Sequence, residues 1–340
     1  MTDDDCQGKD LRRKPKFNGP ASFFLASFAL WSIANAQQTH RLFTTVKLES
    51  VPIASWVTPD NRKLVITTGD DQVLFYDLRL GRVTSRLRLD GSLLFIHVLP
   101  GDKLALIGHW SGRKISLIDL YGNRFTRSIP LGGGPTFFGQ YQREVLVLLA
   151  RHQKLAFLSP FTYRPIKEVE FNSPIAGLAV ATQRGQAYVA VGMQQIAVVD
   201  MTLKKVIRTF NVVTARDTPL VVDPQERWLF ALGPRNSVVR ISLDEEKETK
   251  HISTGSGPTA MEISGDGKYL YVTNGLEGKV AIFDLESFTE LEQVAVGVKP
   301  AAVHVSRDNA YVFVCNRGSR TISILERLQT DSASSVISHR

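Results

Sequence analysis

The sequence has very little cysteine. Among 340 residues only Cys6 and Cys315 are cysteines, and they lie near opposite ends of the chain. Neither belongs to a paired-cysteine zinc motif or to a CxxCH haem-attachment motif. The sequence therefore lacks the usual cysteine signatures of a structural zinc site and of a covalently bound haem.

Long apolar runs are also missing. The longest, Ala21 to Ile33, has 13 mostly apolar residues, which is too short to span a bilayer. Basic residues including Arg12 and Arg13 precede it, and Ala34-Asn35-Ala36 follows it. This is the pattern of a secretory signal peptide over residues 1–36, cleaved after Ala36. We therefore expect a periplasmic or secreted protein without a stable membrane span. An uncleaved anchor is the alternative to cleavage, and a twin-arginine route is the alternative to general secretion.

The charge balance of the expected mature chain is only moderately positive. The whole chain carries a net charge of +8, and residues 1–36 hold five basic and four acidic residues, so about +7 remains. Such an excess is compatible with an acidic partner, but it makes nucleic acid an unlikely one. Cys315 remains as a lone cysteine in an apolar segment, which is typical of a small buried side chain.

Familiar catalytic and phosphate-binding motifs are absent. No nucleophile elbow or Ser-His-Asp spacing occurs. The run from Gly132 to Pro135 has no helix pattern after it, so it does not predict a phosphate loop. The sequence therefore names no reaction.

What the sequence does contain is a repeat. The stretch from Gly257 to Gly297 reads as four strands of about five or six residues, separated by polar turns around Gly265, Asn274 and Asp284. An Asp at the end of the third strand can accept hydrogen bonds from the backbone that follows and so start a turn. The position of Asp284 recurs in steps of 40 to 42 residues, at Asp77, Asp119, Ser159, Asp200, Ser242, Asp284 and Glu326.

Seven copies at this step are typical of propeller blades. We therefore predict an all-β fold: a seven-bladed β-propeller of four-stranded antiparallel blades, over residues 40–328. The last blade supplies only three strands, whereas Leu42 to Leu48 has the pattern of a fourth. We expect this N-terminal strand to complete the last blade and close the ring. Residues 329–340 lack apolar periodicity and are expected to form a disordered tail.

One motif resembles a known family. The run Tyr271-Val272-Thr273-Asn274 resembles the signature of the YVTN family of β-propellers, and the resemblance covers roughly residues 40 to 328. It is closest in the sixth repeat and weakest in the first three. The family occurs in periplasmic proteins of unassigned role and archaeal surface proteins, and beside lactonase and haem-d1 propellers. The resemblance therefore implies an architecture rather than an activity.

Propellers usually bind ligands on the face that carries the loops between second and third strands and the crossovers between blades. Here these loops are rich in arginine, which can bind carboxylates or phosphates with two hydrogen bonds. Trp110 adds a stacking surface. The opposite face carries acidic residues: Asp60, Asp102, Glu226, Asp266 and Asp308. The predicted ligand-binding residues are Trp110, Arg113, Arg151, Arg216, Arg235, Asn274 and Arg317.

Two functional hypotheses follow. The first is a non-catalytic, monomeric propeller without a cofactor, which binds a protein partner or a small anionic ligand on this face. The second is an enzyme or carrier, either a lactonase-like hydrolase with a loop-bound metal or a protein that handles a tetrapyrrole such as haem d1. His109, His152 and Asp70 are the candidate metal ligands. The excess of arginine over carboxylate favours the first hypothesis. His97 and His304, in first strands, are interpreted as core histidines or as lining of the central channel.

Overall fold

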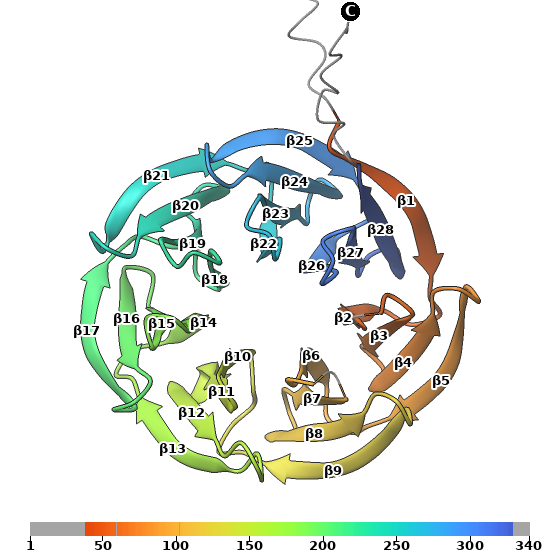
Figure 1. Cartoon of the computed structure of the whole chain (residues 1–340), viewed down its shortest axis with the longest axis horizontal. Coiled ribbons are helices and arrows are strands. Elements are labelled where there is room, and N and C mark those ends of the chain that lie inside the picture. The colour runs from red at the N-terminus through yellow and green to blue at the C-terminus, as the bar shows by residue number, and fades with distance from the viewer. Residues whose placement is uncertain (1–37, 59, 102, 329–340) are drawn as a thin grey trace, which may run out of the picture. The chain divides into compact units, whose positions relative to one another are not determined.

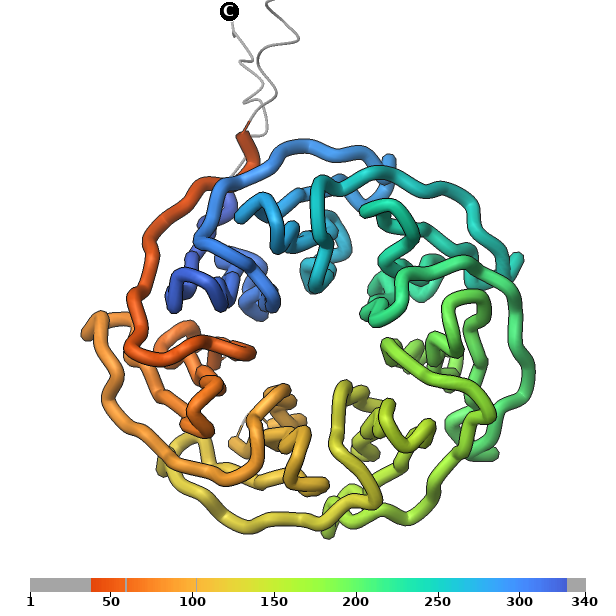
Figure 2. The backbone as a smooth tube through the Cα atoms, turned by 180° about the vertical axis from the view of Figure 1, so that it is seen from behind, coloured from red at the N-terminus to blue at the C-terminus, as the bar shows by residue number. Residues whose placement is uncertain are grey.

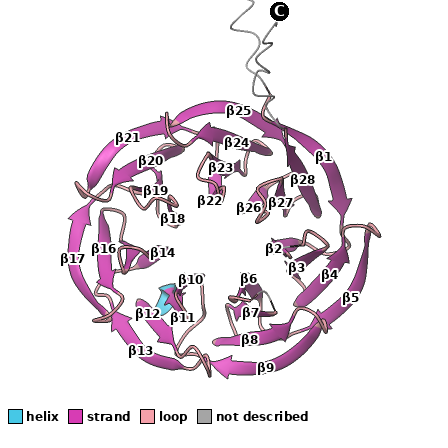
Figure 3. Cartoon of the chain, in the orientation of Figure 1, coloured by secondary structure: helices cyan, strands magenta, loops and turns pink. Residues whose placement is uncertain are grey.

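The computed structural model describes residues 38–58, 60–101 and 103–328. The expected signal peptide, the expected tail and Asp102 therefore lie outside the described residues. Within them, strands and turns make up nearly the whole structure, with one short 3-10 helix, η1 (Ala150–His152) (Figure 3). No helix of the described part is long and apolar enough to cross a membrane.

The strands form seven separate four-stranded antiparallel sheets arranged as the blades of a ring (Figure 1). This confirms the predicted seven-bladed β-propeller. Blades 1 to 3 consist of β2 (Pro52–Val57), β3 (Lys63–Thr68), β4 (Gln72–Asp77) and β5 (Arg82–Arg88); β6 (Leu93–Val98), β7 (Leu104–His109), β8 (Lys114–Asp119) and β9 (Arg124–Pro130); and β10 (Phe137–Tyr141), β11 (Glu144–Leu149), β12 (Lys154–Leu158) and β13 (Pro165–Glu170).

Blades 4 to 6 repeat the plan, with the first strand innermost and the fourth on the outer rim (Figure 1). They consist of β14 (Ile175–Ala181), β15 (Gln186–Val191), β16 (Gln195–Asp200) and β17 (Lys205–Asn211); β18 (Leu220–Val222), β19 (Trp228–Gly233), β20 (Ser237–Ser242) and β21 (Lys247–Ser253); and β22 (Pro258–Ile263), β23 (Tyr269–Asn274), β24 (Lys279–Asp284) and β25 (Thr289–Ala295).

Blade 7 is built from both ends of the ring. Its inner strands are β26 (Pro300–Val305), β27 (Tyr311–Asn316) and β28 (Thr321–Arg327), and β1 (His40–Lys47) pairs antiparallel with β28 as the fourth strand. The expected closure by an N-terminal strand is confirmed, although the strand begins two residues earlier than Leu42. Glu292 of blade 6 explains the early start, because its carboxylate accepts hydrogen bonds from the backbone N–H groups of Thr39 and His40.

The predicted turn after the third strand is also confirmed. Asp77 Oδ1 accepts hydrogen bonds from the backbone N–H groups of the residues two and three positions later, and Asp119 and Asp200 do the same. Glu326 differs, because its blade has β1 as the fourth strand. Its carboxylate pairs with Arg41 of β1 instead, at 2.7 Å.

The core lies between neighbouring blades. Second and third strands are apolar on both faces and buried, whereas outer strands such as β5 alternate between exposed and half-buried residues. Between blades 5 and 6, for example, Phe230 and Phe283 pack with Met261 and Phe288. Because every blade needs a neighbour on each side, the ring must close to bury this surface.

Candidate functional site

The arginines predicted from the sequence lie on the face of the propeller formed by the loops between second and third strands and by the crossovers, which we call the arginine face. The crossovers can be followed in Figure 2. Within the described residues, no ion pair involves these side chains, which are all exposed: Arg113, Arg151, Arg216, Arg235 and Arg317. Arg151 instead lies over the ring of Trp110, with its guanidinium carbon 4.2 Å from the ring centroid.

Two of these arginines have an uncommon backbone conformation. Arg113 and Arg235 have φ angles of 46° and 55°, in the left-handed region that favours glycine and asparagine. Arg113 precedes its strand-closing Asp119 by six residues, and in blade 6 the corresponding position before Asp284 is Gly278, with φ 67°. The left-handed backbone conformation is therefore less favourable with the side chain of Arg113 than it would be with a glycine at this position.

Asp266 and Asp308 of the opposite face serve a structural role. Asp266 accepts a hydrogen bond from Ser264 Oγ at 2.6 Å and pairs with Arg327 at 2.7 Å. Burial acts to raise the pKa of Asp266, but the hydrogen bonds from Ser264 and Arg327 outweigh burial and lower it. Asp308 likewise accepts a hydrogen bond from Ser306, at 2.6 Å. These carboxylates stabilise turns, and their oxygens already accept hydrogen bonds from groups of the protein.

His109 is fully buried and both of its ring nitrogens are bonded. Nδ1 lies 2.5 Å from the carbonyl oxygen of Asp90, and Nε2 lies 2.8 Å from Ser116 Oγ. Burial lowers the pKa of His109, and the hydrogen bond to Asp90 opposes this only in part. Asn316, at the end of β27, makes the same kind of contact, donating to the serine seven residues later, Ser323, at 3.0 Å. His109 therefore links the backbone at Asp90, in the crossover that enters blade 2, to Ser116 in the third strand, β8. We call such a contact between a crossover and a strand a clamp.

Asn274 occupies the equivalent position in blade 6, ten residues before Asp284 as His109 is ten before Asp119. Its side chain is fully buried, donates to the carbonyl oxygen of Thr254 and accepts from Thr254 Oγ1 at 3.2 Å. The asparagine of the YVTN motif therefore fastens the crossover that enters its own blade and leaves no exposed atom for a ligand.

The candidate metal ligands do not form a shared site. His152 packs against Gly133 of the preceding crossover, and its buried Nδ1 has no hydrogen-bond partner among the described residues. Asp70 accepts hydrogen bonds from Ser50 and Thr68, at 2.8 and 2.6 Å. In the part of the chain that the structure describes, no group of three or more His, Cys, Asp or Glu side chains could hold a metal ion. The donor set of His109, His152 and Asp70 does not fit a metal.

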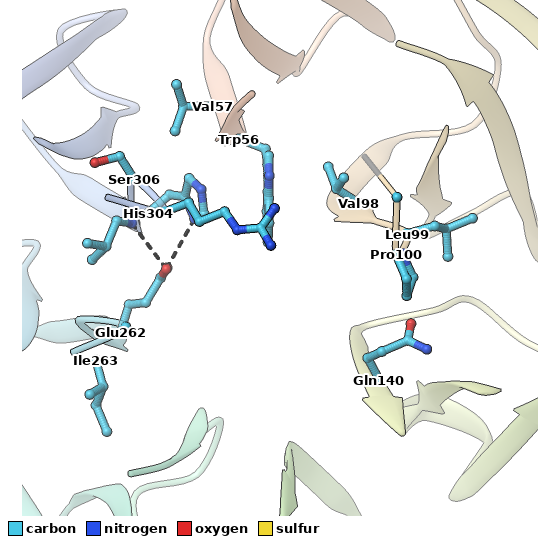
Figure 4. Close-up of a pocket in the computed structure, with 14 residues that line it drawn as sticks. Trp56, Val57, Val98, Leu99, Pro100, Gln140, Glu262, Ile263, His304 and Ser306 are labelled. Carbon is cyan, nitrogen blue, oxygen red and sulfur yellow. Dashed lines mark hydrogen bonds and ion pairs between the residues drawn. The ribbon is translucent and has the colours of Figure 1, made fainter. Parts of the chain in front are cut away.

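The structure reveals a cavity that the sequence reasoning missed. It has a volume of about 490 Å³ and lies at the inner ends of the first strands, on the side of the hairpins between first and second strands (Figure 4). This is the end of the ring opposite the arginine face, and we call it the axial cavity. Its walls include Trp56, Val98, Pro100, Gln140, Glu262 and His304.

Glu262 and His304 form a bonded pair in this wall. His304 Nδ1 lies 3.1 Å from Glu262 Oε1, which also accepts the backbone N–H of Val305 at 3.1 Å. The indole of Trp56 stacks on the imidazole of His304, with ring centroids 4.1 Å apart and planes 26° apart. Figure 4 shows these side chains, from three neighbouring blades, along one side of the cavity.

The positions of these three side chains follow from the register between the first and second strands of their blades. His304, Glu262 and Trp56 pair with Phe313, Tyr271 and Val65, which hold the same position in their second strands. In blade 2 this position is His97, whose Nε2 bonds to Gln140 Oε1 at 3.1 Å and whose pKa burial lowers. Blades 3 to 5 have small or apolar residues there: Gly139, Ala179 and Val221.

A signal for this site was present in the sequence. Glu262 and His304 are 42 residues apart, which is one repeat, so they occupy the same place in adjacent blades. Aligning the repeats by position rather than by loop would have brought them together. The sequence left open whether His304 belongs to the core or lines the channel. The structure shows both, because its side chain is buried and bonded to Glu262 and also lines the axial cavity.

Comparisons with known proteins agree with the fold. A family model described as lactonase, 7-bladed beta-propeller matches residues 220–339, about a third of the chain. Among solved structures, a chain of hydrazine synthase from Kuenenia stuttgartiensis is similar with a TM-score of 0.76. It is 14% identical, and the match covers 85% of this chain and 99% of that one. No curated protein matches the sequence. The comparisons therefore place the chain among the β-propellers.

Proposed function

We propose that this protein is an exported propeller of the YVTN type that binds a protein partner or a small anionic ligand on the arginine face without catalysing a reaction. The observation that carries the proposal is the set of exposed arginines without ion pairs within the described residues. On the opposite face, turn carboxylates such as Asp266 are paired. Free guanidinium groups on a surface of modest net charge suit carboxylate or phosphate groups.

The backbone conformation of Arg113 supports the proposal. Stability alone would favour glycine or asparagine at a φ of 46°. Asp71, Gln153, Asn236 and Arg320 take the same conformation at the equivalent positions of other blades, so the turn imposes it, and the presence of an arginine there is what points to a function. Trp110 and Arg151 add a stacked pair on the same face.

The test compares two variants with the same change in charge. Replacing Arg113, Arg151 and Arg317 by serine removes three charges from the arginine face. Replacing Arg79, Arg82 and Arg88 by serine removes three exposed charges from the outer turn and strand of blade 1. Calorimetry with citrate and pyrophosphate as probes, and quantitative capture of proteins from the periplasm or culture medium of the source organism, should show binding lost only in the first variant. Equal binding by both variants would refute the proposal.

The second candidate function is a lactonase-like hydrolase, and the family-model match over residues 220–339 is the observation that favours it. The matched segment includes Glu262 and His304 of the axial cavity. Hydrolysis of a panel of simple lactones, followed by pH titration, tests this candidate. Turnover that is lost in His304→Gln but kept in the triple arginine variant would favour the hydrolase over the binding protein. Native mass spectrometry of the protein from its own host would also reveal a bound metal or tetrapyrrole.

A further inference from the structure

The axial cavity contains hydrogen-bond acceptors that the protein leaves unused. A carboxylate accepts hydrogen bonds and does not donate them. When the imidazole of His304 is neutral, its proton therefore lies on Nδ1, toward Glu262, and Nε2 keeps a lone pair. Within the described residues, neither His304 Nε2 nor Glu262 Oε2 has a hydrogen-bond partner. A ligand that uses these two acceptors has to supply donors.

Gln140, another polar group of the wall, is already saturated. Gln140 Oε1 bonds to His97, and Gln140 Nε2 donates to the carbonyl oxygens of Gln142 and Glu144, at 2.7 and 3.0 Å. Gln140 therefore cannot donate to a ligand without breaking one of these bonds. This leaves the unused acceptors concentrated on the side formed by blades 6 and 7.

Charge and size narrow the class of ligand further. Glu262 and Arg307 both line the cavity, so its lining has one group of each sign and does not favour a ligand of either charge. Trp56, Val98 and Pro100 give the cavity apolar wall. A volume of about 490 Å³ is within the usual range for small-molecule sites.

We propose that the axial cavity binds a neutral, polyhydroxylated ring of the size of a mono- or disaccharide. Its hydroxyl groups donate to Glu262 Oε2 and His304 Nε2, and its C–H face packs on the apolar wall. Such a ring combines several donors with an apolar face and no charge. The site is independent of the arginine face, because it lies at the other end of the ring and shares no residue with it.

The test is saturation-transfer difference NMR on the full chain. The probes are D-glucose, maltose and N-acetyl-D-glucosamine, with tetramethylammonium as a cationic comparator. We expect transfer to at least one sugar and none to tetramethylammonium. Transfer to none of the three sugars, or to the cation alone, overturns the proposal.

Two variants and one control locate the binding. Glu262→Gln keeps an oxygen that can accept from Val305 and His304 but removes the charge, and should weaken sugar binding at least tenfold. Pro100→Trp fills the cavity from an exposed position and should abolish binding without disturbing the core. Glu286→Gln, at an exposed turn of the same blade, should bind as the wild type does. Unchanged affinity in both cavity variants would place any sugar elsewhere and overturn the proposal.

Discussion

Blades 2 and 6 share a backbone plan but hold different residues at three equivalent positions. Where blade 6 has Glu262, Asn274 and Gly278, blade 2 has His97, His109 and Arg113. In blade 6 the three suit their local structure: a carboxylate bonds to a histidine, an amide clamps a crossover, and a glycine takes a left-handed turn.

Blade 2 fills the same positions with titratable or strained residues. Burial lowers the pKa of both His97 and His109, and Arg113 has a φ of 46°. Blade 2 therefore has partly or fully buried histidines and a left-handed arginine at positions where blade 6 has residues that suit the local structure. Four substitutions test this difference between the two blades.

The largest effect is expected where β1 meets blade 6. His40 is fully buried, its Nε2 lies 2.8 Å from Tyr271 Oη, and burial lowers its pKa from 6.5 to about 4 against the opposing effect of Glu292. The unfolded chain therefore binds this proton first, so stability falls as the pH drops from about 6.5 to about 4 and then levels off. The loss is on the order of 3 kcal/mol.

Urea unfolding at a series of pH values measures this loss. His40→Gln should flatten the profile between pH 6.5 and 4, whereas His251→Gln, at an exposed histidine of β21, should leave it unchanged. If the free energy of unfolding depends on pH in the same way in wild type and His40→Gln, protonation of His40 does not weaken the contact between β1 and blade 6.

The next effect concerns the clamp of blade 6. Asn274→Ala leaves the carbonyl and hydroxyl groups of Thr254 without their buried partner, which should cost about 2 kcal/mol. Denaturant unfolding at pH 7 measures the loss, and Asn211→Ala on the exposed rim is the matched control. If the two variants unfold at the same midpoint, Asn274 does not anchor the blade.

A smaller effect of opposite sign is expected in blade 2. Arg113→Gly installs the residue that blade 6 has at this position, and should raise stability by up to about 1 kcal/mol because the left-handed conformation no longer carries a side chain. The same variant should bind the anionic partner less well. Lys114→Gly, one residue later at the start of β8, is the contrast and should lower stability. A destabilised Arg113→Gly would remove the argument from backbone strain.

The smallest effect should come from exchanging the clamps. His109→Asn places the blade 6 residue in blade 2, and Asn316 shows that an asparagine can reach the serine seven residues later. We expect a loss below about 1 kcal/mol at pH 7, against about 2 kcal/mol for His109→Ala. The loss of stability between pH 7 and pH 5 should then be smaller in this variant than in the wild type, because asparagine does not take up a proton. Equal losses for the asparagine and alanine variants would mean that His109 is not a simple clamp.

The sequence predicted the fold well because each blade repeats the same local rules. The strand-closing Asp residues form the expected turns, and the missing fourth strand of blade 7 pointed to β1. The site was harder to predict, because loop position alone does not say whether a side chain is exposed. His109 and Asn274 are the last residues of β7 and β23, at positions where the sequence predicted loops, and their side chains are buried.

The axial cavity was not predicted from the sequence, for a related reason. Trp56 and His304 contact one another although they are 248 residues apart in sequence, and only closure of the ring brings their blades together. No local pattern encodes such a contact. The repeat period encodes it indirectly, as a shared position in successive blades.

Closure of blade 7 by β1 also has a topological consequence. The backbone N–H of Leu328 donates to the carbonyl oxygen of Thr39 at 2.8 Å, so the two ends of the described ring are hydrogen-bonded neighbours. The closed ring therefore does not depend on which blade comes first in the chain. A circularly permuted gene that joins residue 328 to residue 39 and opens the chain at an exposed outer turn, such as that at Leu203, should encode the same ring.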